Sequence, residues 1–318
     1  MASNKSALTT SKLLASIKRR TLAPTSSITF SDEDLIEFLN EEMNIGLVPS
    51  IIQMKDEYLV YKAIVEIEPG NSTYPIPSRA IGNKLREISY SPDGNNEYNM
   101  TQIELDNKVS NNYLSQGGFY ASQFYVQGSE IHLHPSDFNY SGKLFFYYYM
   151  RPNYLVKDAN VAVIDHIDYA TGTITVKSIP KEYNTELLFD FVSSDSPNNI
   201  MAVDIPIVSL NTTTKTIVVN PLLLPKNLGQ GDYMPICGES CIPNVPTELH
   251  PILAQRVALR VLEALGDTQG VANAKLKLDE MESKTGVLID SRVEGSAVKI
   301  KNRQMQYTLR GRFMRGTF

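Results

Sequence analysis

The chain has 318 residues, of which 42% are hydrophobic and 20% charged, and its formal net charge is −5. This composition is typical of a folded globular protein with a large core in one or two domains, and it excludes a disordered chain. The longest apolar run, Leu144 to Met150, is too short for a membrane span, and no apolar stretch typical of a signal peptide opens the chain. We therefore expect a soluble protein, made in a cytoplasm, without a membrane partner.

The first segments predict helices. Residues 11–20 place Leu13, Leu14 and Ile17 on one face, with basic residues at the C-terminal end, where they oppose the helix dipole. A second helix should begin at Ser31, because Ser31-Asp32-Glu33-Asp34 resembles a capping box. Its buried stripe continues to Met43, Gly46 should end it before Pro49, and residues 48–54 add a further turn or two.

The hydrophobic period then changes from 3.6 to 2, which predicts strands. Residues 58–67, 85–90 and 143–151 have strand composition, and Gly128 separates the two halves of a hairpin. Residues 101–114 are ambiguous between helix and loop. Short strands at close spacing favour an antiparallel sandwich or small barrel. The remaining strand candidates are residues 162–167, 173–179, 187–192, 202–210 and 216–219.

Residues 247–286 predict a helical hairpin. The first helix carries a wide apolar stripe, for which Thr247 should be the N-cap and Gly266 the left-handed residue at the end. Asp267 or Thr268 should cap the second helix, and Gly286 should end it. The packing positions of the first helix are Leu249, Leu253, Val257, Val261 and Leu265. Such a wide stripe indicates that this helix is buried on most sides.

The predicted fold class is therefore α+β. Residues 1–55 and 237–290 should form a helical platform, with residues 56–236 as a long antiparallel β-sandwich or barrel insertion. Residues 291–318 should form an extended arm. That arm contains seven basic residues and one acidic residue, a net +6, so the preceding 290 residues carry a net −11. Such a difference in charge within one chain indicates an interaction tail.

The search for chemistry yields no strong motif. The sequence has no Gly-rich phosphate loop followed by lysine, no nucleophile elbow and no His-Glu-x-x-His zinc helix. His132 and His134 would face the same side of a strand, and we expect both to be half-exposed. Residues 165–168 favour a surface strand edge. Cys237 and Cys241 are half of the usual set of zinc ligands, so reduced thiols are expected. We predict no catalytic, metal or cofactor site, and no enzyme.

The arm instead predicts a protein partner. Its basic residues alternate with apolar ones, which suits arginines on acidic patches and apolar side chains in grooves. The predicted partner-binding residues, for another protein or a neighbouring subunit, are Arg292, Lys299, Lys301, Arg303, Tyr307, Arg310, Arg312, Phe313 and Arg315.

Four stretches carry a resemblance to a known family: Ile17–Arg20, Tyr74–Gly82, Pro246–Arg256 and Leu262–Gly270. Together they resemble the head-to-tail connector (adaptor or ring) proteins of short-tailed bacteriophages, close to the crAss-like group. The resemblance implies a virion protein of the neck or tail, assembled in the host cytoplasm as a ring of twelve copies below the portal protein. It also implies contact with another neck or tail ring, and DNA passing non-specifically through the lumen.

Two other classes of function stay open at this point. A tail-hub or receptor-binding β protein could recognise host glycans by stacking sugars on Tyr147 to Tyr149. Solvent-facing tyrosines with carboxylates in a pocket would favour that reading, whereas burial would favour the connector. A small hydrolase using His166 and Asp168 would need a nucleophile beside them in a cleft.

Overall fold

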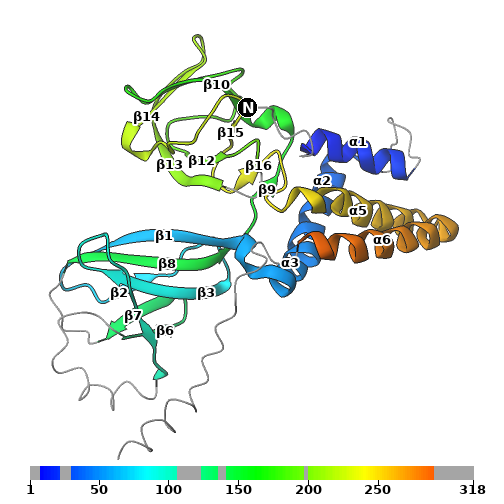
Figure 1. Ribbon diagram of the computed structural model, residues 1–318. Helices are drawn as coiled ribbons and strands as arrows, with labels where there is room; N and C mark the ends of the chain where they lie inside the picture. The colour runs from blue at the N-terminus through cyan, green and yellow to red at the C-terminus, as the bar shows by residue number, and fades with distance from the viewer. Residues whose placement is uncertain (1–7, 22–29, 106–122, 135–140, 197–199, 290–318) are drawn as a thin grey trace, which may run out of the picture.

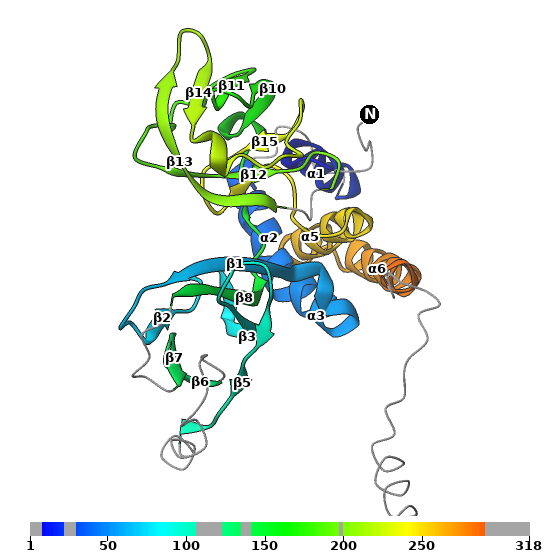
Figure 2. The same cartoon turned by 60° about the vertical axis from the view of Figure 1, so that its left-hand side comes forward.

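The computed structural model describes residues 8–21, 30–105, 123–134, 141–196 and 200–289. The fold is α+β, as predicted. The helices gather on one side of the molecule, and the strands form two separate bodies on the other side (Figures 1 and 2). The arm predicted for residues 291–318 lies outside the described residues. In the part of the chain that is described, no helix combines the length and apolarity needed to span a membrane.

The helical platform is assembled from both ends of the chain. Its core joins Leu13 and Ile17 near the N-terminus to Leu253 and Val257 near the C-terminus, and all four are at most 2% exposed. Its helices are α1 (Thr10–Arg20), α2 (Asp32–Glu41), the π-helical η1 (Glu42–Leu47), α3 (Val48–Lys55), the 3₁₀ turns η2 (Asp56–Leu59) and η6 (Thr247–Leu249), α5 (His250–Leu265) and α6 (Thr268–Leu288). Segments distant in sequence thus share one apolar interior.

The N-terminal helices begin as predicted, but the second does not stop where expected. The side chain of Ser31 accepts from the Asp34 backbone N–H, and the Asp34 carboxylate accepts from the Ser31 backbone N–H. The capping box is therefore confirmed. Gly46 does not end the helix. The chain passes through it as a π-helical turn and continues into α3, because Pro49 occupies the first turn of α3, where a missing N–H is harmless.

The C-terminal hairpin is confirmed with corrections at its ends. Thr247 is not the N-cap, since a 3₁₀ turn precedes α5 and Leu249 occupies the cap without a side-chain bond. Gly266 has φ 72°, the predicted left-handed end, and Asp267 caps α6 by accepting from the Gly270 N–H. Gly286 does not close α6, which continues to Leu288 because an isolated glycine weakens a helix without breaking it.

The first β body, the sheet unit, contains two small sheets with a core between them. One has the order β1-β8-β3-β4 and the other β2-β7-β6-β5. The predicted hairpin around Gly128 is β6 and β7. The strands are β1 (Val60–Ile67), β2 (Thr73–Pro75), β3 (Ala80–Ser91), β4 (Tyr98–Asn99), β5 (Thr101–Gln102), β6 (Gln123–Gln127), β7 (Glu130–His134) and β8 (Gly142–Met150). Pairing is antiparallel except between β5 and β6.

The second β body is a closed barrel of order β10-β11-β14-β13-β12-β15. Its core, around Phe189, Phe191 and Ile217, comes from one contiguous stretch of chain. The strands are β10 (Ala162–Asp168), β11 (Thr173–Val176), β12 (Leu188–Val192), β13 (Ile200–Asn211), β14 (Thr216–Val219) and β15 (Tyr233–Met234). Two short 3₁₀ turns belong to this half of the chain, η4 (Asp158–Asn160) before β10 and η5 (Pro221–Leu223) after β14.

A short parallel pair of strands, β9 (Tyr154–Leu155) and β16 (Glu239–Ser240), runs between the barrel and the platform. The barrel also contacts the sheet unit, since Val192 and Ile200 belong to the core that the sheet unit builds. The sequence predicted one β insertion, whereas the strands divide into two bodies. Strand composition is the same in both, and only the pairing separates them.

Candidate functional site

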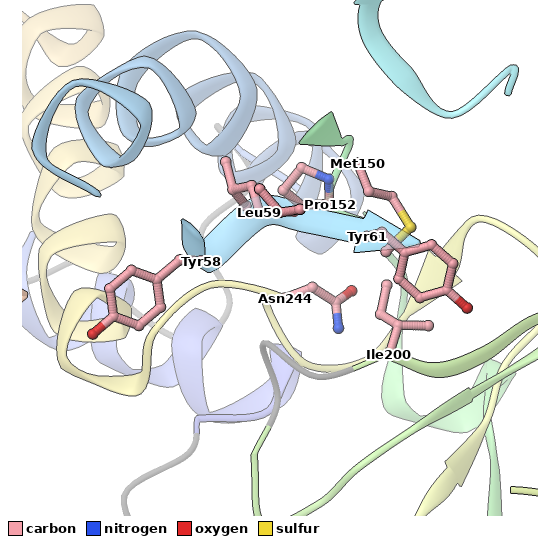
Figure 3. Close-up of a pocket in the computed structure, with 8 residues that line it drawn as sticks. Tyr58, Leu59, Tyr61, Met150, Pro152, Ile200 and Asn244 are labelled. Carbon is pink, nitrogen blue, oxygen red and sulfur yellow. The ribbon is translucent and has the colours of Figure 1, made fainter. Parts of the chain in front are cut away.

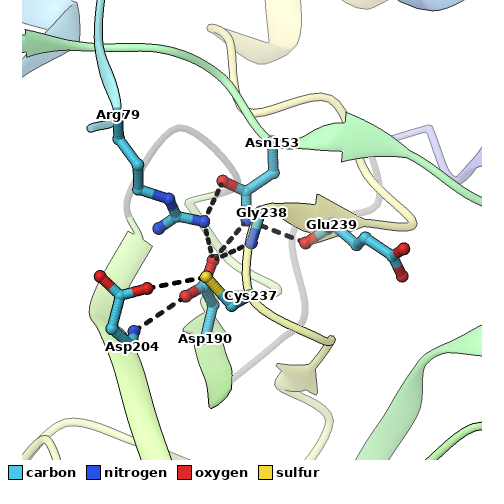
Figure 4. Close-up of polar contacts among 7 residues, drawn as sticks. All are labelled: Arg79, Asn153, Asp190, Asp204, Cys237, Gly238 and Glu239. Atoms are coloured by element: carbon cyan, nitrogen blue, oxygen red, sulfur yellow. Dashed lines mark hydrogen bonds and ion pairs between the residues drawn. The ribbon is translucent and has the colours of Figure 1, made fainter. Parts of the chain in front are cut away.

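A polar site lies between the sheet unit and the barrel (Figure 4). We call Arg79, Asn153, Asp190, Asp204 and Cys237 the joint cluster. Arg79 precedes β3 in the sheet unit, Asp190 lies on β12 and Asp204 on β13 of the barrel, Asn153 precedes β9, and Cys237 precedes β16. The sheet unit, the barrel and both connecting segments therefore contribute side chains.

A buried ion pair lies at the centre of the joint cluster. The Arg79 Nη2 is 2.5 Å from the Asp190 Oδ2, and the Asp190 side chain is 0% exposed. The same carboxylate oxygen accepts from the Asn153 amide at 2.8 Å and from the Gly238 N–H at 3.1 Å. Burial lowers the pKa of Arg79, but the Asp190 carboxylate outweighs burial, so the pKa is raised and the guanidinium stays charged.

The other half of the cluster is a thiol against a carboxylate. The Cys237 Sγ donates to the Asp204 Oδ1 at 2.7 Å, and the Asp204 N–H donates to the Asp190 Oδ1 at 3.2 Å. Burial first, and then the bond to Asp204, raises the pKa of Cys237 to about 12. The thiol is therefore protonated near neutral pH and is a poor nucleophile.

Among the residues that the structure describes, Asp190, Asp204 and Cys237 form a group that could hold a metal ion, with ligand atoms within 4.8 Å of one another. Both Asp190 oxygens are, however, already bonded, and Arg79 supplies the positive charge beside them. A cation would have to displace Arg79 and deprotonate Cys237. The arrangement fits a structural tie better than a metal centre.

A small pocket opens where the platform, the sheet unit and the barrel meet (Figure 3). The start of β1, the end of β8, the barrel strand β13 and the segment leading to α5 all contribute to it. Its volume is about 90 Å³, which leaves room for a few water molecules. Sites for drug-sized ligands are several times larger. It is lined by Tyr58, Leu59, Val60, Tyr61, Met150, Pro152, Ile200 and Asn244.

Two arginines of α5 tie the platform helices together. Arg256 and Arg260 reach the acidic side chains of neighbouring helices. Arg256 binds Glu282 of α6 through Nη2 at 2.6 Å and lies 3.8 Å from Glu42. Arg260 pairs with Glu41 of α2. A Cβ on Gly46 would lie 2.4 Å from the Arg256 Nη1, so the guanidinium would have to shift to make room for a side chain there.

The predicted packing positions of α5 are confirmed with one exception. Leu249, Leu253, Val257 and Val261 are at most 3% exposed, whereas Leu265 is 46% exposed. Leu265 is the last residue of α5, at the turn of a hairpin that projects beyond the other helices (Figure 1). The predicted partner-binding residues, Arg292 to Arg315, lie outside the described residues.

The tyrosines proposed for glycan stacking divide between the two faces of β8. Tyr148 is 2% exposed and packs in the core of the sheet unit. Tyr147 is half-buried on the opposite face, where its hydroxyl donates to Glu97 and Lys62 lies over its ring. Tyr149, 6% exposed, donates to Asp56. The carboxylates beside Tyr147 and Tyr149 are therefore already bonded within the chain.

The histidine candidates are positioned by structural contacts. His132 is half-buried and stacks on Tyr125, with ring centroids 4.8 Å apart, while His134 is 2% exposed. His134 therefore contradicts the expected half-exposure: it shares one side of β7 with His132, opposite the core residues Ile131 and Leu133, and is nevertheless buried at the end of the strand. His166 and Asp168 lie exposed on β10, and Asp168 bonds the turn that follows through Ala170 and Thr171.

Sequence reasoning missed the joint cluster. One signal was present, because Asp190 interrupts the apolar strand Leu188-Phe189-Asp190-Phe191-Val192, and a carboxylate in such a strand needs a buried partner. The partner, Arg79, is 111 residues away and has no local signature. Comparisons with known protein families and with curated proteins found no match for this chain.

Proposed function

We propose that the chain is a structural subunit of a head-to-tail connector ring of a short-tailed bacteriophage, related to the crAss-like group. In this role it joins the portal protein to the tail and forms part of the DNA channel. The observation that carries the proposal is the platform itself. Helices from both ends of the chain share one core, and two β bodies project from it. The resemblance in sequence implied this arrangement of a helical platform with a β insertion.

The outer surface of the platform supports a role in assembly. The α6 helix has 21 residues, yet its buried side chains among those described are Ala274 and Leu278. Leu276, on another side of α6, is 70% exposed, and Ile45 in the π-helical turn is 76% exposed. Apolar side chains on rigid helices are suited to contacts with a neighbouring subunit.

The charge distribution supports a channel lined by this protein. Residues 1–290 carry a net −11, and a negative wall repels the phosphates of DNA, so that DNA slides past without binding. In the proposed virion neck, copies form a ring of twelve, with the portal on one side and another neck or tail ring on the other. We propose a structural role and no catalysis.

The mass of the native assembly tests the proposal. We expect the purified protein to form rings of uniform mass, alone or on addition of purified portal protein, measured by native mass spectrometry and seen by electron microscopy. A protein that stays monomeric and does not bind portal would contradict the connector function. Binding to a glycan array in that case would favour the receptor-binding alternative.

The basic arm has its own experiment. Truncation after Asp290 removes a net +6 and leaves every described helix intact. If the arm attaches the protein to the portal or to an adjoining subunit, the truncated chain keeps its melting temperature and loses capture by purified portal. If the arm instead holds DNA, the intact chain binds DNA without portal, with an affinity that falls steeply with salt.

A further inference from the structure

The sheet unit has one long edge strand. In the part of the chain that the structure describes, β1 ends its sheet and pairs only with β8, over eight residues without proline. The other outer strands of the two sheets, β2, β4 and β5, have two or three residues each. Short edge strands limit further pairing, whereas a long one presents a row of backbone N–H and C=O groups to another strand.

The second half of β1 is the part that can accept a strand. Val60 and Tyr61, at its start, line the pocket that Ile200 of the barrel also lines. From there β1 runs away from both the platform and the barrel (Figures 1 and 2). Ile64 is 57% exposed. We call residues 63–67 the open edge.

The apolar inner layer of this sheet is incomplete at the open edge. Ala63 and Val65 lie directly opposite Phe146 and Leu144 of β8. Phe146 and Leu144 are 0% exposed, whereas Ala63 and Val65 are only partly buried, although they pack against the same core. A further strand beyond β1 would cover Ala63 and Val65 if its apolar side chains recurred at every second position.

Exposed carboxylates flank the open edge. Glu66 lies on the outer face of β1, and Glu68 directly follows the strand. Neither carboxylate forms an ion pair with another described residue. The one basic residue of β1, Lys62, is already bound by Glu97 at 2.6 Å. The open edge therefore favours a strand that has basic residues beside its apolar ones.

The arm of this chain contains a segment with that pattern. Met305, Tyr307 and Leu309 alternate with polar residues, so an extended backbone places all three on one face. Arg303 and Arg310 stand at the two ends of the segment. The alternation matches Ala63 and Val65 on the inner face, and the arginines match the carboxylates beside the open edge.

We propose that residues 305–309 of one copy add a strand to the open edge of the neighbouring copy in the connector ring. The inference rests on the proposed ring and names the surface that receives the arm. Each copy has an arm with a net +6 and a body with a net −11, so the contact between arm and body opposes the repulsion between bodies.

The geometry of this contact suits a ring. An arm on an edge joins two different surfaces, so the contact repeats from copy to copy and does not close a dimer. Ile289, the last described residue, packs in the platform core, and residues 290–302 can span about 45 Å from it to the next copy. A strand of five residues is a small contact, so it adds to contacts between platforms and does not replace them.

Two substitutions in the arm test the alternation. Tyr307→Gln removes an apolar side chain from the face that covers Ala63 and Val65. We expect the apparent dissociation constant between copies to rise by about tenfold or more. The matched control is Thr308→Gln, which introduces the same side chain on the opposite face and should change the constant by less than about twofold. Both variants keep the charge of the arm. Rings that assemble equally well in both variants would overturn the added strand and leave the ring standing.

Hydrogen exchange and crosslinking locate the contact. On assembly, amides of residues 63–67 should exchange about tenfold more slowly or less, because the added strand binds the free side of β1. A photo-crosslinker at position 307, in a mixture of isotopically heavy and light copies, should link heavy to light copies at residues 63–67. Crosslinks within single copies, or to the platform or added portal alone, would overturn the inference. A wild-type chain that never assembles would overturn both the inference and the ring.

Discussion

The barrel and the helical platform are built in opposite ways. Apolar residues of the barrel core come from one stretch between Ala162 and Ile236, and the pairing of β10 with β15 that closes the barrel lies within that stretch. The platform core instead joins Leu13 to Leu253 and Ile289, so it needs both ends of the chain. The barrel can form once its own segment is made, whereas the platform must close a loop of more than two hundred residues.

This difference predicts how far the effect of a destabilising substitution should extend through the molecule. A defect in the platform releases both ends of the chain and exposes the faces that we propose for assembly. A defect on the barrel surface is confined to one closed body. The joint cluster ties the barrel to the sheet unit, and its removal should affect how these two bodies are held together more than how each is folded.

The largest expected effect is from Val257→Asp in the platform. Val257 is 0% exposed, and an unpaired carboxylate there costs several kcal/mol. We expect α1, α2 and α5 to lose hydrogen-exchange protection and the ring to be lost, while barrel amides remain protected. The control is Thr175→Asp. Thr175 is half-buried on β11 of the barrel, and the substitution should leave folding and assembly unchanged. Loss of protection throughout the chain would show that barrel and platform unfold as one unit.

Breaking the ion pair of the joint cluster should come next. Arg79→Met leaves the fully buried Asp190 carboxylate without its charged partner, which should lower the free energy of unfolding by about 3–5 kcal/mol. Asp190→Leu leaves the Arg79 guanidinium without its charged partner and should cost a similar amount. The double variant should lose much less free energy of unfolding than the two single variants lose together, as measured by denaturant unfolding. Additive losses would mean that the two charges do not depend on each other.

A pH dependence should distinguish the platform from the barrel. His250 is buried in the platform, where its Nδ1 accepts from the Leu8 N–H at 3.1 Å and its Nε2 lies 3.2 Å from the Val245 carbonyl oxygen. Burial lowers its pKa from 6.5 to about 4. The unfolded chain therefore binds the proton first as the pH falls from 6.5 to 4, and protonation opposes folding over that range.

We expect the free energy of unfolding to fall by up to about 3 kcal/mol over that range because of His250. The measurement is urea unfolding at several pH values, compared with His250→Gln, whose amide can make both bonds but does not titrate. Above pH 7 the free energies of unfolding of the two proteins should show the same dependence on pH. An identical pH slope in the variant would remove His250 as the cause.

Glycine substitutions give effects that differ between the two regions, and the smallest are in the platform. In the barrel, Gly172 has φ 71°, and an added Cβ would lie 2.1 Å from the Val219 carbonyl oxygen, so Gly172→Ala combines strain with a clash. In the platform, Gly266 has φ 72° and open space, so Gly266→Ala should cost only about 1–2 kcal/mol of strain. Gly286→Ala lies within α6 and should stabilise by up to about 1 kcal/mol. Melting temperatures should therefore rank Gly286→Ala highest and Gly172→Ala lowest.

The sequence by itself determined those features that depend on neighbouring residues. The Ser31 capping box, the left-handed Gly266, the Asp267 cap and the apolar stripe through Val257 were all predicted and confirmed. Each is set by hydrogen bonds or periodicity within one or two helical turns, which a local pattern records. The α+β class followed from the change of hydrophobic period between the ends and the middle of the chain.

Tertiary structure alone decided what depends on distant partners. Strand composition could not divide the β-rich segment into a sheet unit and a closed barrel, because the same residues suit either pairing. Gly46 does not end the helix, and its backbone lies against Arg256, which comes from the other end of the chain. The joint cluster was missed for the same reason. Asp190 signalled a buried charge, but its partner is defined by packing between bodies, and no pattern along the sequence encodes that contact.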